Sequence, residues 1–452
     1  MRRTLRELPE SLDETYERIL KEIKKPNRGH ARRVLQCLVV AIRPLRVGEL
    51  AEVLAVDFDD GERIPRPKPD WRWEDQEQAL LIACSSLIVI VEADNVKADD
   101  VEARDVEAGN SDSESETDDG DSYVEDGDSR VVQFSHFSVK EFLTSSRLAA
   151  ASGEAPNYYI DLEPAHTILG QTCLGVLLQI QDDVDGHTRK DHPLAEYAAE
   201  YWTTHAQSGV SSRFQKGMEY LFDPDKPHFR VWLTLYNIDT HPNLGSTLYF
   251  FARSRKSPAA PLYYAALCGF HDLVDHLITK YRQDVNANGG IYSRPLVAAL
   301  AGEHFQTADL LRHNGADLHI RGAFGATPIQ SAANHGNLEV VRKCIEYDAD
   351  INAEDEDGWT PLHDASTGNN FKDGSVLRLL LGHVADVNVR TKDGWTPLHL
   401  ASHNGKLEVV GLLLEHGADV EVKDNDGETA LQVASDRGHN KVVKLLQEHG
   451  AK

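Results

Sequence analysis

Two histidines stand at the same place in two identical heptapeptides. The sequence DGWTPLH occupies residues 357–363 and again residues 393–399, so that His363 and His399 lie 36 residues apart. An imidazole can ligate a metal ion or act as a general base near neutral pH. A heptapeptide that occurs twice is therefore either a chemical site used twice or a structural unit, and the rest of the chain must decide between these two interpretations.

Cysteine is the second side chain that could do chemistry. The chain has five cysteines that lie far apart, and no C-x-x-C pair indicates a metal or redox site. We predict that they are reduced core residues and that the chain holds no metal: Cys37, Cys84, Cys173, Cys268 and Cys344.

Phosphate-binding and catalytic motifs are missing from the sequence. A nucleotide site needs a G-x-x-x-x-G-K-[ST] loop, but Leu407 follows the single Gly-Lys pair, Gly405-Lys406. The G-x-S-x-G and H-E-x-x-H motifs are also missing. We therefore expect no catalytic residues, no cofactor and no nucleotide. An orphan active site around His187, Asp191 and His192 stays open as an alternative to a polar loop.

A strongly acidic insertion covers residues 92–130. Between Glu92 and Asp128 there are 16 acidic and 2 basic residues, about half of the imbalance behind the net charge of −26. Repulsion and few large apolar residues predict disorder. Three of its serines precede an acidic residue by three positions and are phosphorylation candidates: Ser111, Ser113 and Ser115. The alternative is a solvated, unmodified loop.

An internal repeat runs through the C-terminal part of the sequence. Prolines recur at intervals of 34, 33, 33 and 36 residues, and an alanine takes the equivalent place 33 residues later: Pro261, Pro295, Pro328, Pro361, Pro397 and Ala430. The sequence of each unit predicts a turn, a helix, a second turn and a second helix. Thr396 is placed to cap a helix that Pro397 begins and Gly405 ends. Two such short helices cannot bury their apolar faces alone, so stability must come from stacked neighbours.

These units resemble the ankyrin repeat. The similarity covers about 257–452 and is strongest in GWTPLHLASHNGKLEVVGLLLEHGADV at 394–420 and in GATPIQSAANHGNLEVVRKCIEYDADIN at 325–352. The resemblance implies a mostly α-helical solenoid of about six units. It also implies that the Thr and His of T-P-L-H bond to each other, so His363 and His399 become structural residues.

The resemblance further implies a partner-binding surface. Ankyrin repeats bind proteins through the tips of their hairpins and through the concave face of their first helices. The tip candidates are Asp355, Glu356, Asp357, Trp359, Arg390, Thr391, Lys392, Trp395, Asp424, Asn425, Asp426 and Glu428. The inner-helix candidates are Asn334, His335, His403, Asn404, Asp436 and Arg437. Either tryptophan could instead pack on its neighbouring hairpin. The acidic tip at 355–357 predicts a protein partner with a basic patch.

The N-terminal half predicts a different fold. A capping box at 11–14 opens a helix, further helices are expected in 30–42, 47–56 and 73–87, and LIVIV and VVQFSHF are expected strands. This order suggests a winged helix. The region of its third helix, residues 71–87, offers only Arg72 against Glu74, Asp75 and Glu77, whereas phosphate contacts need basic residues. Nucleic acid is therefore not expected, and a transcriptional regulator that binds DNA stays the alternative.

A second resemblance covers roughly 1–250. LPESLDETYERIL, RPLRVGELAEVLAVD, HFSVKEFLTSSRL and HPLAEYAAEYWTTHA are similar to the winged-helix and linker region behind the nucleotide-binding domain of fungal NACHT–ankyrin (STAND) proteins. It implies an N-terminal helix in 1–25, a winged-helix-like domain in 26–150, a helical linker in 151–256 and an adaptor role in signalling. Without the phosphate loop, the chain is expected to be a stand-alone relative, a partner in trans or a truncated gene product.

The location follows from what the sequence lacks. No apolar run approaches the roughly 20 residues that span a bilayer, and MRRTLRELPESL lacks the apolar stretch of a secretory signal. We expect an intracellular, cytoplasmic protein, with the nucleus as the alternative.

Overall fold

The chain divides into two compact units, Met1–Ile238 and Asp239–Lys452. The computed structural model describes residues 12–58, 64–71, 75–84, 86–93, 130–151, 153–181, 184, 188–236, 238, 259–290, 292, 294–319, 321, 326–367, 374–383 and 385–451. The acidic insertion, with Ser111, Ser113 and Ser115, lies outside this set apart from residues 92, 93 and 130. The finer division of residues 1–256 stays a prediction.

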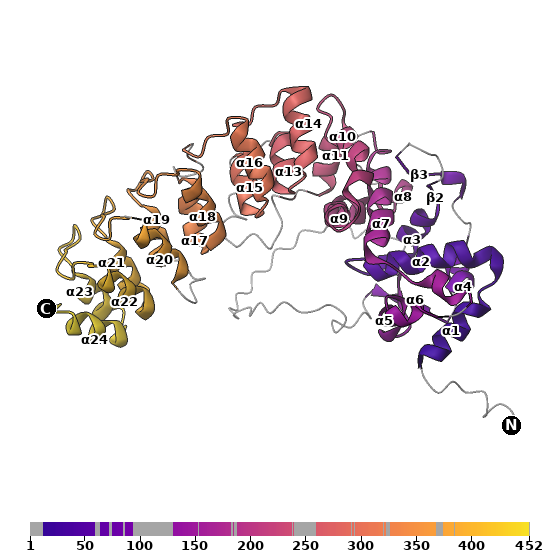
Figure 1. Cartoon of the computed structure of the whole chain (residues 1–452), viewed down its shortest axis with the longest axis horizontal. Coiled ribbons are helices and arrows are strands. Elements are labelled where there is room, and N and C mark those ends of the chain that lie inside the picture. The colour runs from indigo at the N-terminus through magenta and orange to yellow at the C-terminus, as the bar shows by residue number, and fades with distance from the viewer. Residues whose placement is uncertain are drawn as a thin grey trace, which may run out of the picture. The chain divides into compact units, whose positions relative to one another are not determined.

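The second unit contains six described helix pairs that follow one another side by side (Figure 1). Each first helix begins at the residue that the repeat alignment indicates. The pairs are α13 (Pro261–Leu267) with α14 (His271–Tyr281), α15 (Pro295–Ala301) with α16 (Phe305–His313), α17 (Pro328–His335) with α18 (Leu338–Glu346), α19 (Pro361–Thr367) with α20 (Ser375–Gly382), α21 (Pro397–His403) with α22 (Leu407–Glu415), and α23 (Ala430–Asp436) with α24 (Asn440–Glu448).

Local chemistry sets the ends of these helices. The Thr396 hydroxyl accepts a hydrogen bond from the His399 backbone N–H, which confirms the predicted cap of α21. Pro397 occupies the first position, where an N–H has no helical partner. Gly405 follows with φ 66°, the left-handed conformation that ends the helix. Thr429 caps α23 in the same way, although Ala430 replaces the proline.

Burial in this unit comes from neighbouring pairs. Val410 and Leu413 of α22 are fully buried, and Val409 and Leu412 are nearly so. First helices pack against the first helices of the next pair, as α17 does with α19 and α21 with α23. Each pair therefore completes its core with side chains of its neighbours, as expected of a repeat array.

The described residues of the first unit form two small antiparallel sheets. β1 (Leu45–Arg46), β5 (Arg130–Phe134) and β4 (Ile88–Glu92) form one sheet in the order β1-β5-β4. β2 (Val56–Asp57) and β3 (Arg66–Pro67) form the other. The two strands expected from LIVIV and VVQFSHF are β4 and β5, whereas the two-residue strands β1, β2 and β3 are too short to give a sequence pattern.

Helices make up most of the described part of the first unit (Figure 1). The helix expected after the capping box is α1 (Leu12–Glu22). The others are α2 (Arg28–Val40), α3 (Val47–Leu54), α4 (Gln76–Cys84), α5 (Ser138–Leu143), α6 (Ser146–Ala149), α7 (Leu162–Leu177), α8 (Thr188–Asp191), α9 (Ala195–Ser208), α10 (Gln215–Leu221) and α11 (His228–Leu235), with 3-10 turns at Lys25–Asn27, Pro69–Trp71, Ala155–Tyr158 and Ser211–Arg213.

Buried polar contacts attach α9 to the rest of this unit. The Tyr197 hydroxyl accepts from the Ile42 backbone N–H at 3.2 Å and lies 2.9 Å from His205 Nε2. His205 Nδ1 lies 2.8 Å from His166 Nδ1 on α7, and burial lowers the pKa of His205 to about 3. Because His205 is neutral at physiological pH, this chain of hydrogen bonds carries no buried charge.

The described part of the chain has no helix with the length and apolar character needed to cross a membrane.

Candidate protein-binding surface of the repeats

The polar side chains of the T-P-L-H sequence form hydrogen bonds inside the repeats. His363 Nε2 lies 3.1 Å from the backbone carbonyl of Trp395 in the next repeat. A carbonyl can only accept, so Nε2 carries the proton and Nδ1 accepts from the Thr360 N–H at 3.1 Å and its hydroxyl at 3.0 Å. Burial lowers the pKa of His363 to about 4, so the ring is neutral.

The second heptapeptide has the same geometry. His399 Nε2 lies 3.2 Å from the Glu428 carbonyl, and its Nδ1 lies 2.8 Å from the Thr396 hydroxyl. Both ring nitrogens of each histidine are therefore engaged. No group of three or more His, Cys, Asp or Glu side chains suited to a metal ion occurs among the described residues. The heptapeptide behaves as a structural unit.

Glutamine replaces histidine in two repeats and makes equivalent bonds. Gln330 accepts from the Thr327 backbone N–H through Oε1 at 2.8 Å and donates through Nε2 to the Trp359 carbonyl at 2.8 Å. Gln432 likewise accepts from the Thr429 N–H at 2.8 Å. An amide has no function as a base, so the shared role of this position is to join a helix start to its surroundings.

The first side chain of each hairpin tip shapes the turn. Asp355 Oδ1 accepts from the N–H groups of Asp357 and Trp359 at 2.9 and 2.8 Å. Asp424 Oδ1 accepts from the two equivalent N–H groups, and the Thr391 hydroxyl accepts from the Trp395 N–H at 3.1 Å. These bonds are the local side-chain turns that Asp and Thr favour.

The prediction of partner contact is therefore corrected for two residues. Thr391 and Asp424 each expose only 7% of their surface, because their side chains point into the hairpins that they form. A partner cannot reach them without opening the turn. They determine the shape of the tips and leave the contact to their neighbours.

Adjacent tips are joined to one another. Lys392 N–H donates to the Asp357 carbonyl at 2.9 Å, and Asn425 N–H donates to the Asp393 carbonyl at 3.1 Å. The Arg390 guanidinium and the Asn425 amide add bonds to the neighbouring backbone at Lys423 and Lys392. The remaining predicted tip side chains are exposed on this connected row: Glu356, Asp357, Lys392, Asp426 and Glu428.

The two tip tryptophans are half-buried. The Trp359 ring lies 6.1 Å from the His363 ring. The Trp395 ring lies 6.2 Å from His399 and 5.3 Å from His403, between ring centroids. Each tryptophan thus packs on histidine rings of its own repeat and leaves part of its surface to solvent, and packing on the neighbouring hairpin stays a prediction.

The inner-helix candidates lie on the first helices or directly after them. The exposed ones are Asn334, His335, Asn404, Asp436 and Arg437, while His403 is half-buried. Sequence reasoning missed Asp364, whose Oδ1 accepts from the Asn334 amide at 3.3 Å. Burial raises the pKa of Asp364 to about 7. Buried Tyr264, Ala298, Leu400 and Val433 and half-buried Ser331 occupy its place in the other repeats, and the absence of a charge at all five is the signal that could have found it.

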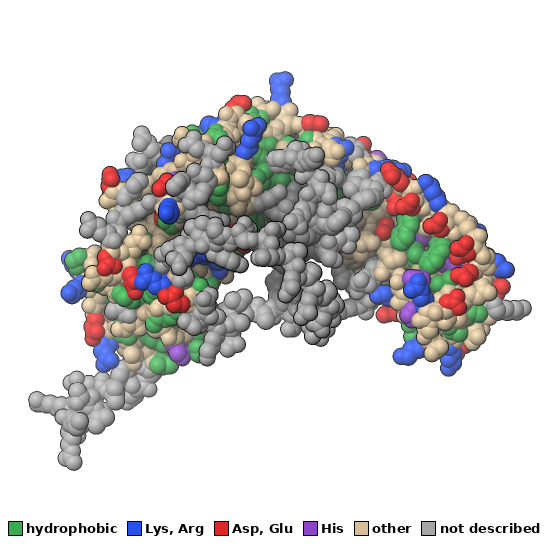
Figure 2. Space-filling model, turned by 180° about the vertical axis from the view of Figure 1, so that it is seen from behind, with side chains coloured by type: hydrophobic (Ala, Val, Ile, Leu, Met, Phe, Trp, Pro, Cys, Tyr) green, Lys and Arg blue, Asp and Glu red, His purple; other side chains and the backbone are tan. Residues whose placement is uncertain are grey.

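The surface of this unit is acidic. Residues 259–452 contain 27 acidic and 17 basic residues, a net charge of −10. Figure 2 shows acidic side chains gathered around a hydrophobic group on the visible face of the C-terminal repeats. Such a field attracts positively charged partners.

The candidates in the first unit have structural contacts. His192 Nδ1 lies 3.8 Å from buried Glu52, which also accepts from the Leu194 N–H at 2.8 Å. Asp191 ends α8, and His187 lies outside the described residues. The five cysteines are free and buried as predicted, and burial raises the pKa of three of these thiols to about 12: Cys37, Cys84 and Cys344.

The comparisons with known proteins agree with the geometry of the second unit. A family model for ankyrin repeats (3 copies) matches residues 296–373 and 368–452. Residues 296–452 carry ankyrin repeats. These repeats suggest a protein-interaction role.

One curated relative extends over more of the chain. The chain is 29% identical over 323 residues to azaphilone pigments biosynthesis cluster protein L of Monascus ruber. The match covers 69% of this chain, and the chain spans 61% of the relative's length.

Proposed function

We propose that this chain is a non-catalytic adaptor that binds a protein partner through its ankyrin tips and the concave face of its first helices. The observation that carries this proposal is that some polar side chains of the repeats are buried and hydrogen-bonded, while others are exposed at the tips. The rings of His363 and His399 are hydrogen-bonded inside the repeats. Glu356, Asp357 and Lys392, in contrast, are exposed on a row of turns that hydrogen bonds connect. A pre-ordered surface loses little entropy on binding.

The partner carries a basic patch that faces the tip at 355–357. This tip contributes exposed Glu356 and Asp357, and Asp355 holds its turn. The protein acts inside the cell, in the cytoplasm. We further propose a relationship to STAND-type signalling receptors, without their nucleotide-binding domain.

Charge reversal tests the adaptor proposal. We expect E356K/D357K to reduce capture of the partner from cells of the native organism, as quantified by mass spectrometry, while E408K/E415K on the exposed face of α22 leaves it unchanged. Equal capture by both variants would contradict binding through this tip. Asp355 is left intact because its carboxylate forms the turn.

The winged-helix interpretation is proposed for residues 26–150. It is supported by the order α2, β1, α3, β2, β3, α4, β4, β5 and by the antiparallel hairpin of β4 and β5. DNA recognition is the weaker alternative, because α4 carries Glu77 and neither Lys nor Arg between Gln76 and Cys84. A sequence-independent gel shift at physiological salt would favour that alternative.

A further inference from the structure

The boundary between the second and third repeats lacks one bond that other boundaries have. Gln330, His363 and His399 each place a side-chain nitrogen 2.8 to 3.2 Å from a backbone carbonyl of the following repeat. Val297 occupies their position in α15. A valine side chain has no hydrogen-bond donor, so it cannot make this link to the third repeat.

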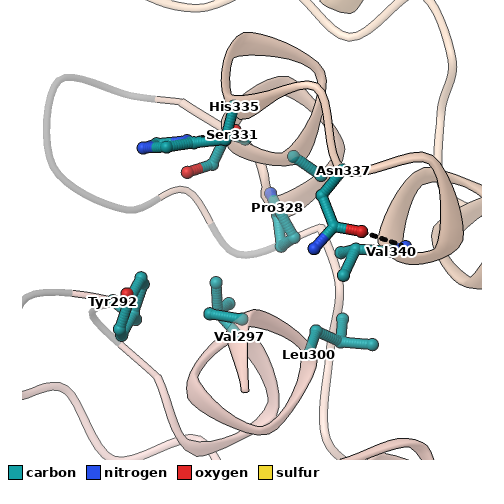
Figure 3. Close-up of a pocket in the computed structure, with 10 residues that line it drawn as sticks. Tyr292, Val297, Leu300, Pro328, Ser331, His335, Asn337 and Val340 are labelled. Atoms are coloured by element: carbon teal, nitrogen blue, oxygen red, sulfur yellow. Dashed lines mark hydrogen bonds between the residues drawn. The ribbon is translucent and has the colours of Figure 1, made fainter. Parts of the chain in front are cut away.

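A pocket of about 140 Å³ lies at the same boundary, between α15 and α17. Val297 and Leu300 form one side of it, and Pro328 and Val340 form the other (Figure 3). A cavity of about 150 Å³ can hold a benzene molecule. The pocket therefore has room for the end of one leucine, methionine or phenylalanine side chain.

An acidic residue in a strained conformation lies beside this pocket. Glu303 has φ 59°, where the aligned residues of other repeats are the left-handed glycines Gly269, Gly336, Gly405 and Gly438. A left-handed conformation is unfavourable for glutamate. Its carboxylate accepts at 3.1 Å from the amide of Asn337, which lines the pocket and caps α18. The chain thus keeps a carboxylate here at a cost in stability.

A second carboxylate lies one helix further along the concave face. Asn334 of α17 donates to Asp364 of α19, at a position that is apolar and buried in Leu400 and Val433. Glu303 thus places an acidic group next to Asn337 of the pocket, and Asp364 lies on the next first helix. Glu303 and Asp364 are both acidic at positions where stability alone favours a glycine or an apolar residue.

We infer that the pocket between α15 and α17 holds an apolar side chain of the protein partner, and that a lysine or arginine close to it in the partner pairs with Glu303. This inference rests on the proposed function and specifies its partner. The net charge of −10 over residues 259–452 favours a basic peptide segment. An isolated apolar small molecule would gain nothing from the two carboxylates.

A random 12-residue peptide library displayed on phage, selected on the full chain, provides the probe. We expect selected peptides to share one Leu, Met, Ile or Phe with a Lys or Arg within a few residues. For the best synthetic peptide, A301W should raise Kd by about tenfold or more, because exposed Ala301 lines the pocket and the indole would occupy it. E303Q should raise Kd several-fold and weaken its dependence on salt.

The matched control is K444W, which adds the same indole on the exposed face of α24 and should leave Kd unchanged. Circular dichroism melting must show that all variants fold. Equal affinity of the parent and A301W, selected peptides without the shared apolar residue, or a selection that yields no binder would overturn the inference. Peptides that lose affinity with E356K/D357K but not with A301W would overturn it while leaving the adaptor proposal intact.

Discussion

At the scale of single residues, His363 shows how burial removes chemical capability. Its two nitrogens join Thr360 to the next repeat, and the folded state disfavours the imidazolium. The pKa is about 4 in the folded protein against 6.5 for the free side chain. The unfolded chain therefore binds the proton more readily, so the contribution of His363 to stability is complete above pH 6.5 and is lost as the pH falls toward 4.

The first prediction uses the glutamine that the chain itself places at this position. H363Q should keep the free energy of unfolding at pH 7, because Gln330 already makes the equivalent bonds. Between pH 6.5 and pH 4 it should lose less stability than the parent, by up to about 3 kcal/mol. Urea unfolding at several pH values measures this. Parallel pH profiles for both proteins would contradict the neutral, buried histidine.

A second prediction concerns left-handed residues that are not glycine. Glu303 and Asp348 have φ of 59° and 60°. E303G and D348G should each raise the free energy of unfolding, by about 0.5 to 1 kcal/mol after the extra freedom of glycine in the unfolded chain is subtracted.

The two glycine variants are matched, because both relieve the same backbone conformation. Only E303G should weaken binding of the selected peptide, since Asp348 follows α18 and does not line the pocket. Thermal melting and peptide titration measure the two effects. A loss of stability in both variants would show that the carboxylates stabilise the fold by more than the strain costs.

At the scale of the element, α19 carries an acid on a face that is apolar in α21 and α23. The pKa of Asp364 is about 7 in the folded protein against 3.8 for the free side chain. The folded state therefore holds the proton more tightly, and Asp364 reduces stability progressively as the pH rises from 3.8 to 7.

The third prediction follows from this sign. D364L, which copies Leu400, should raise the free energy of unfolding, and the gain should be larger at pH 8 than at pH 5 by on the order of 1 to 2 kcal/mol. Urea unfolding at the two pH values measures it. A gain that does not depend on pH would mean that Asp364 ionises freely in the folded protein.

The helices of the repeats could be predicted from the sequence, whereas the residues that depart from the repeat pattern could not. Helix starts at Pro328, Pro361 and Pro397 were predicted because a fixed period, a threonine cap and a proline agree at each. Val297, Glu303 and Asp364 were missed because each is ordinary as a residue and unusual only at its place in the repeat.

Contacts across the chain were not predictable. His205 meets His166 across 39 residues, and Glu52 meets Leu194 across 142 residues. No local pattern encodes such pairs, because burial and tertiary packing place them.

At the scale of the whole molecule, the two compact units place their charged side chains differently. In the first unit Arg43 pairs with buried Glu49, and Arg147 pairs with Asp13 at the surface. The second unit leaves its charged side chains on an ordered row of tips. The ordered row of tips supports the proposal that the repeats bind a partner.

Partner capture by two double variants tests the central claim most directly. H363Q/H399Q removes the imidazoles of both heptapeptides and keeps their structural bonds, whereas E356K/D357K changes only exposed tip charges. We predict that the histidine variant captures as much partner as the parent and that the tip variant captures much less. Loss of capture with H363Q/H399Q in a protein that melts normally, together with full capture by E356K/D357K, would contradict the account.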